Sequence, residues 1–168
     1  MPVRFLKQEN EVNSRSFPFN FETRKKMLES VFGNSITVSL NYSFQAPFKK
    51  YFPPLISLKS WSLRKQILQG IESDYFTYTG DKAEGLMLKL YRLNPKIGVR
   101  KSVSATDVKN KMYEVAKGNE SKWEKYMPEG IVQIINENWE TVRKFASTED
   151  MTKRIAGMKF PKEGYDSK

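Results

Sequence analysis

The sequence predicts an α/β fold, with a doubly wound parallel sheet followed by a helical C-terminal part. β-Branched segments alternate with amphipathic helical patterns through the middle of the chain, an order typical of parallel strands joined by crossover helices. With 168 residues, of which 39% are hydrophobic, the chain can bury one domain core without a disulfide or metal. We expect one domain over residues 1–147 and a polar tail over 148–168.

The first predicted elements are a strand, a helix and a second strand. Residues 3–7 have the composition of a short strand. Apolar side chains recur at helical spacing over Phe21–Phe32, where Asn20 is the expected N-cap and Gly33 the expected stop. Residues 35–40 are rich in β-branched side chains and are predicted to form a strand.

An irregular insertion over residues 41–56 interrupts this alternation, because its prolines and aromatic residues follow neither period. Beyond it we expect a helix over 58–71, a strand over 74–79, a helix over 82–93 and a short strand over 96–100.

The C-terminal part is predicted to be helical from Ser104 onward. Pro128 occupies a position where a first helical turn tolerates proline. The segment after Ser147 is polar, and residues 160–168 are expected to be frayed.

The composition excludes several kinds of chemistry. The chain has no cysteine and no histidine, so a thiol nucleophile, a Ser-His-Asp triad and a His-ligated metal are all ruled out. The formal charge of +10 favours anionic partners such as nucleotides or nucleic acid. No run of 18 apolar residues and no signal-peptide pattern occurs, so we expect a cytoplasmic protein without a membrane partner.

Ligands of doubly wound sheets bind at the carboxyl ends of the strands, which selects two segments. One is the turn at Gly80 and Asp81, and the other is 102–109. Ser104 either caps a helix or, with Thr106, Lys109 and the nearby lysine at 111, holds a phosphate at the helix N-terminus.

Three further candidates each have two interpretations. Arg24 belongs either to an ordinary basic helix face or to a phosphate clamp. Trp61 is either a core residue or a stacking platform for a planar ring. Asp81 either starts a helix or binds a ribose hydroxyl.

Five motifs occur in an order that resembles one enzyme family. They are Pro18-Phe19 through Arg24, Trp61, the turn Thr79-Gly80-Asp81, the signature Ser104-Ala-Thr-Asp-Val-Lys109, and the segment from Gly118 through Trp123 to Pro128. Over about residues 14–146 the chain resembles the archaeal-type nicotinamide mononucleotide adenylyltransferases, within the cytidylyltransferase-like nucleotidyltransferase superfamily.

The resemblance implies a Rossmann-like nucleotidyltransferase fold that joins ATP, with Mg²⁺, to nicotinamide mononucleotide, giving NAD and pyrophosphate. It places Ser104 and Thr106 on the ATP phosphates, with Lys109 in the position of a signature arginine. Trp61 would stack on the nicotinamide ring, and Arg24 would lie near the mononucleotide. Gly80 and Asp81 would together form the nucleotide-binding turn.

The family's opening strand, its H-x-G-H motif and its first helix have no counterpart in this sequence. We therefore expect an incomplete sheet, no activity from this chain alone, and a partner chain or self-association that completes the sheet. The alternative is a non-catalytic basic module that binds nucleic acid or a partner protein. The charge of +10 and the basic-aromatic stretch over 44–52 favour this second interpretation.

Overall fold

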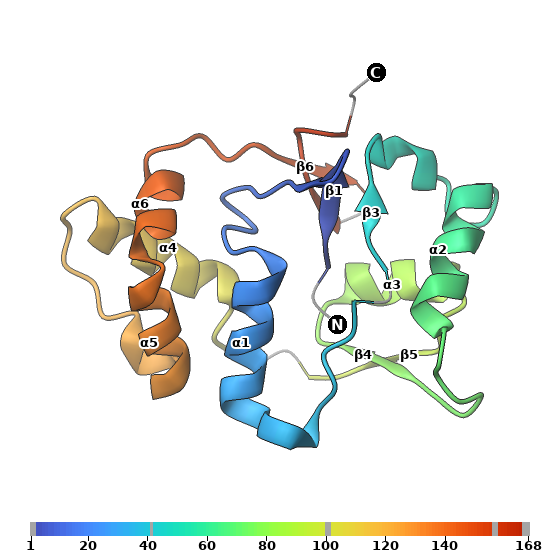
Figure 1. Ribbon diagram of the computed structural model, residues 1–168, viewed down its shortest axis with the longest axis horizontal. Coiled ribbons are helices and arrows are strands. Elements are labelled where there is room, and N and C mark those ends of the chain that lie inside the picture. The colour runs from blue at the N-terminus through green and yellow to red at the C-terminus, as the bar shows by residue number, and fades with distance from the viewer. Residues whose placement is uncertain (1–2, 41, 100–101, 156–157, 166–168) are drawn as a thin grey trace. The chain divides into compact units, whose positions relative to one another are not determined.

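A computed structural model of the chain describes residues 3–40, 42–99, 102–155 and 158–165 (Figure 1). It divides the chain into two compact units. Unit 1 contains residues 13–39 and 102–151, and unit 2 contains residues 4–12, 40–101 and the segment from 152 onward. Both units are therefore built from segments that are far apart in the sequence.

Unit 1 is helical. Its elements are α1 (Phe21–Phe32), the 3₁₀ turn η1 (Gly33–Ser35), α4 (Ala105–Ala116), the 3₁₀ turn η3 (Glu124–Tyr126), α5 (Glu129–Glu137) and α6 (Trp139–Ala146).

Unit 2 contains the strands. Its elements are β1 (Phe5–Lys7), β2 (Asn10–Glu11), β3 (Phe44–Gln45), the 3₁₀ turn η2 (Phe48–Tyr51), α2 (Leu58–Leu68), β4 (Thr77–Thr79), α3 (Lys82–Leu90), β5 (Pro95–Ile97), β6 (Thr152–Ile155) and β7 (Met158–Pro161).

The limits of α1 follow from its two caps. The Asn20 side chain accepts a hydrogen bond from the Thr23 backbone N–H at 2.9 Å, and Gly33 ends the helix with φ +52°. Helix α1 packs against α5, and α4 packs against α6. The core of the unit consists of Phe19, Val108, Met112, Tyr113, Trp123, Ile135, Val142 and Ala146.

An aromatic cluster forms the core of unit 2. Strand β1 pairs in parallel with β3, with Phe5 opposite Phe44, and pairs antiparallel with β2. Phe160 from β7 is fully buried, with its ring centroid 5.5 Å from that of Phe5 and 5.6 Å from that of Phe44. The expected fraying of the segment from residue 160 is therefore wrong for its described part, because a ring shielded by aromatic neighbours gains far more from burial than a free end gains in entropy.

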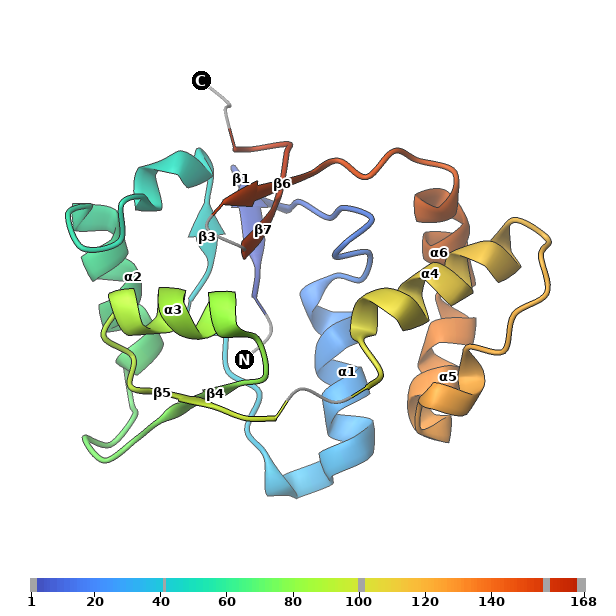
Figure 2. The same cartoon turned by 180° about the vertical axis from the view of Figure 1, so that it is seen from behind.

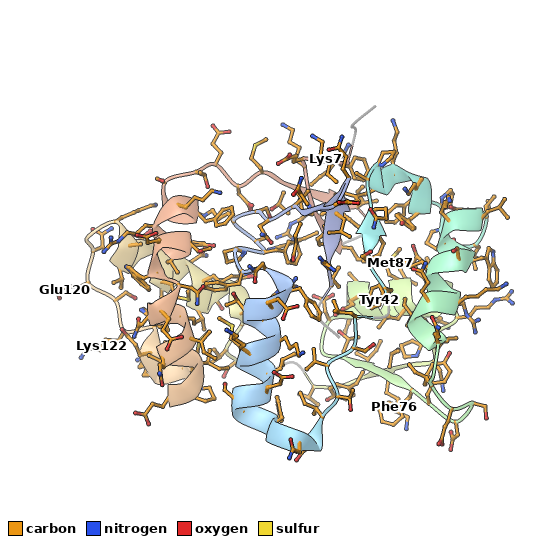
Figure 3. The ribbon with its side chains drawn as sticks, in the orientation of Figure 1. Lys7, Tyr42, Phe76, Met87, Glu120 and Lys122 are labelled. Atoms are coloured by element: carbon orange, nitrogen blue, oxygen red, sulfur yellow. The ribbon has the colours of Figure 1, made fainter. Side chains whose placement is uncertain are left out.

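Strands β4 and β5 pair in parallel and are connected through α3, with Thr77 opposite Pro95 and Thr79 opposite Ile97. Helix α3 lies along one face of these two strands (Figures 1 and 2). Gly85 makes this approach possible, since a Cβ there would lie 2.7 Å from Ile97 Cδ1. Phe76 extends on the face of β4 opposite α3 (Figure 3), where the Lys96 ammonium lies 3.8 Å from its ring centroid.

The α/β class is confirmed, but a single doubly wound sheet is not. The described strands form one sheet of three strands and two sheets of two strands. The predicted strand over 35–40 is wrong: Ser35 ends η1, and residues 36–40 have no strand partner in the described part of the chain. Of the 41–56 segment, residue 41 lies outside the described residues; the rest is mostly irregular, as expected, but contributes β3 and η2 to the core. Of the expected 96–100 strand, residue 100 lies outside the described residues.

Candidate functional site

The first turn of α4 is held by a reciprocal cap. The Ser104 hydroxyl accepts a hydrogen bond from the Asp107 backbone N–H at 3.1 Å and donates one to Asp107 Oδ2 at 2.6 Å. The capping interpretation of Ser104 is therefore confirmed, which leaves the phosphate interpretation as a proposal. Thr106 is exposed on the same turn, and its hydroxyl has no hydrogen-bond partner within the described residues.

Lys109 faces a loop of unit 1. Its ammonium group donates to the Ser16 carbonyl and lies 5.9 Å from the Phe17 ring centroid. One turn further along α4, the buried Tyr113 hydroxyl donates to the Arg15 carbonyl at 2.6 Å, and the Arg15 guanidinium lies over the Tyr113 ring at 4.7 Å. These contacts fix α4 against residues 15–17. No residue pattern indicates the Arg15–Tyr113 contact, because it depends on a pairing between segments almost a hundred residues apart.

A pocket of about 610 Å³ opens beside the start of α4. Asp107 and Lys111 line it, as do residues that sequence reasoning did not select, including Asn110 and Tyr126. The Lys111 ammonium lies 5.7 Å from the Tyr126 ring centroid. The pocket thus combines one carboxylate, one ammonium and one aromatic ring near the free N–H groups of a helix N-terminus.

Arg24, the remaining candidate in unit 1, lies on the first turn of α1. Its Nε donates to the carbonyl of Asn20 at 3.3 Å, so part of its guanidinium supports the helix start.

In unit 2, Asp81 is the N-cap of α3. Its Oδ1 accepts hydrogen bonds from the backbone N–H groups of Ala83 at 2.8 Å and Glu84 at 3.1 Å. Gly80 forms the exposed bend that connects β4 to this cap. The helix-start interpretation of Asp81 is confirmed.

Trp61 lies on α2 and is half-buried. Its indole N–H donates to the Leu55 carbonyl at 3.2 Å, and the Arg92 guanidinium lies over its ring at 5.3 Å from the centroid. Arg92 also lines a second pocket, again of about 610 Å³, between α3 and β5. Sequence reasoning selected Trp61 but missed Arg92.

The seven candidate residues thus fall into two groups by unit. Unit 1 brings Ser104, Thr106 and Lys109 onto the first turns of α4 and contains Arg24 on α1. Unit 2 contains the other three candidates: Trp61, Gly80 and Asp81.

Burial shifts the pKa values of two tyrosines strongly. It raises the pKa of Tyr113 and of Tyr91 far above the usual value near 10, so both phenols remain protonated in the folded protein. Neither can act as a base at neutral pH. Their hydroxyls serve as structural donors, to Arg15 in one case and to the Tyr51 carbonyl, at 3.2 Å, in the other.

The described residues hold no group of three or more metal-ligating side chains. Asp107 is the carboxylate that lines the pocket at α4. One carboxylate fits a magnesium ion that arrives on the phosphates of a nucleotide rather than one held in a protein cage. Among the same residues, no helix is long and apolar enough to cross a lipid bilayer.

Comparison with known proteins gives no match for this chain, whether against family models, curated proteins or solved structures.

Proposed function

We propose that this chain binds a nucleotide through the pocket at the start of α4, as a relative of the nicotinamide mononucleotide adenylyltransferases that does not complete the reaction alone. The observation that carries the proposal is the position of this pocket, directly beside the signature segment from Ser104 to Lys109. Pocket volume also supports it, because about 610 Å³ lies within the range of small-molecule sites.

In this proposal the phosphates of ATP approach the N–H groups at the start of α4. Lys111 offers an ammonium group in the pocket wall, and Thr106 offers an exposed hydroxyl on the first turn of the same helix. Because the Asp107 carboxylate lines the same pocket, bare phosphates would be repelled, and Mg²⁺ carried by the ATP would relieve this repulsion. Nucleotide binding should therefore require magnesium.

The Rossmann-like arrangement belongs to the same proposal. The β4–α3–β5 crossover has the connection from which doubly wound sheets are built, and β1 and β3 form a second parallel pair. We propose that these pairs are parts of an incomplete nucleotidyltransferase sheet that a further chain, or a second copy, would extend.

Calorimetry with MgATP tests the binding site. We expect weak binding by the wild type, loss of binding in the Ser104→Ala, Thr106→Ala double variant, and at least fivefold weaker binding in Lys111→Gln. Lys117→Gln is the matched control, because it removes the same charge from the far end of α4. Removing magnesium with a chelator should abolish binding by the wild type.

Two results would contradict the binding proposal. Wild type that gives no heat with millimolar MgATP would remove it, and a double variant that binds as tightly as wild type would place the site elsewhere.

Catalysis is tested separately, by NAD formation from ATP and nicotinamide mononucleotide with Mg²⁺. We expect no measurable product, because the signature segment supplies one side of a phosphate cradle and the sequence contains no histidine for the other side. A fragment that carries the family's first strand, H-x-G-H motif and helix should restore some activity. Turnover near the median enzyme value of about 10 s⁻¹ by the chain alone would show another route to the transition state.

A further inference from the structure

The groove between α3 and β5 in unit 2 is lined by three cations and by no carboxylate. Lys82 and Lys89 lie seven residues apart on one face of α3, about 10 Å along the helix axis. Arg92 follows directly after the helix. Within the described residues, neither lysine ammonium has an ion-pair or hydrogen-bond partner, so both charges remain available to a ligand.

Between the two lysines the groove is apolar. Leu86 and Ile97 line it and remain 55% and 54% exposed, so they present apolar surface to a ligand. Gly85 lets Ile97 pack directly against the backbone of α3, since a Cβ there would lie 2.7 Å from Ile97 Cδ1. The groove thus alternates cation, apolar surface and cation along its length.

Arg92 has a backbone conformation that residues other than glycine seldom adopt. Its φ is +54°, in the left-handed region, and its carbonyl accepts hydrogen bonds from the Arg64 guanidinium and the Tyr75 hydroxyl, both at 3.4 Å. This conformation places the guanidinium over Trp61 while Arg92 still lines the groove. The guanidinium carbon lies 5.3 Å from the Trp61 ring centroid, and Arg92 is exposed.

We propose that the α3–β5 groove binds single-stranded nucleic acid. Lys82 and Lys89 contact phosphates, one base stacks on the Arg92 guanidinium, and an adjacent base rests on Leu86 and Ile97.

Two features favour a strand over a small anion. Lys82 and Lys89 lie two helical turns apart, so a ligand that carries charge at more than one place along its length can contact both while each side chain stays extended. Apolar surface between the cations suits a ligand in which flat rings alternate with charges, as bases alternate with phosphates. This site lies in the other unit from the pocket at α4, and it can be tested whether or not that pocket binds ATP.

The test is fluorescence anisotropy of a fluorescein-labelled oligothymidylate titrated with the full chain over a range of NaCl concentrations. The Lys82→Gln, Lys89→Gln double variant should bind at least tenfold more weakly at low salt. The slope of the logarithm of its binding constant against the logarithm of NaCl concentration should become shallower by about 1.4, the value expected for the loss of two phosphate contacts with a single strand. Lys89→Gln alone should lower the slope by about 0.7.

The matched control is Lys59→Gln, Lys65→Gln, which has the same formal charge but removes exposed lysines of α2 outside the groove. It should change the slope by less than half as much. Arg92→Lys keeps the charge and removes the stacking plane, so it should weaken binding by roughly fivefold without changing the slope. Thermal melting followed by circular dichroism confirms that each variant is folded.

Three results would overturn the proposal. The first is a wild type that binds no strand saturably at low salt. The second is equal weakening of oligonucleotide binding by both double variants, which would show that affinity depends on total charge and not on this groove. The third is displacement of the strand by AMP at concentrations near the strand's own dissociation constant, which identifies a mononucleotide site.

Discussion

Phe160→Ala should remove a large share of the stability of unit 2. The ring is fully buried, and its centroid lies 5.5 Å from that of Phe5, 5.6 Å from that of Phe44 and 5.5 Å from that of Phe52. Truncating a buried Phe to Ala costs about 3–5 kcal/mol in lost transfer free energy and cavity formation. Because the truncation removes several aromatic pairs together, we expect the upper half of this range. In a chain of this length the melting temperature should fall by roughly 8–20 °C.

Urea and thermal unfolding measure the loss of stability, and hydrogen exchange shows where it occurs. Protection of the β1 and β3 amides should fall, since both strands carry rings that contact Phe160. Phe160→Leu, which keeps most of the volume, should cost much less. Phe76→Ala is the control for a more exposed aromatic residue and should cost at most about 1 kcal/mol, the upper value for an exposed cation–π contact such as the one with Lys96. A loss below about 1 kcal/mol in Phe160→Ala would refute the reasoning.

Three further changes test single contacts. Asp81→Ala removes the N-cap of α3 and should cost about 1 kcal/mol in urea unfolding, whereas Asp81→Asn, which keeps the accepting oxygen, should cost less. Gly118→Ala should lower the free energy of unfolding by about 1–2 kcal/mol, because φ at Gly118 is +92°. Gly118→Asn should cost less, and an equal cost in the two variants would contradict this reasoning. Burial raises the pKa of Tyr113, so the unfolded chain ionises at a lower pH than the folded one. The free energy of unfolding should therefore be constant below about pH 10 and fall above it. Tyr113→Phe should make this fall shallower, and an unchanged pH profile in the variant would contradict the prediction.

Helices were predictable from local chemistry. The limits of α1 follow from Asn20 and Gly33, and the start of α4 follows from Ser104, since each cap is a contact between residues three or four apart. The same locality makes the capping interpretations of Ser104 and Asp81 accessible from the residue order alone. A resemblance to a family could not decide whether Ser104 also binds a phosphate or Asp81 a ribose hydroxyl.

Strands and tertiary contacts were less predictable, because they depend on distant partners. The β-branched run at 36–38 has strong strand propensity but no partner strand in the described part of the chain. Phe160 lies in a polar segment, and only its neighbours from β1 and β3 reveal it as a core residue. Arg92, whose guanidinium lies over the Trp61 ring, has a left-handed backbone, a conformation that no residue pattern indicates.

The burial of Phe160 among residues from the start of the chain has a consequence for synthesis on the ribosome. The rings of Phe5 and Phe44 emerge early, but the residue that closes their cluster is translated more than a hundred residues later. Until then these apolar rings lack their final cover, a condition that favours chaperone binding and aggregation. Unit 1 likewise waits for α6 to cover α4. Neither core can therefore be complete before α6 and Phe160 have left the ribosome.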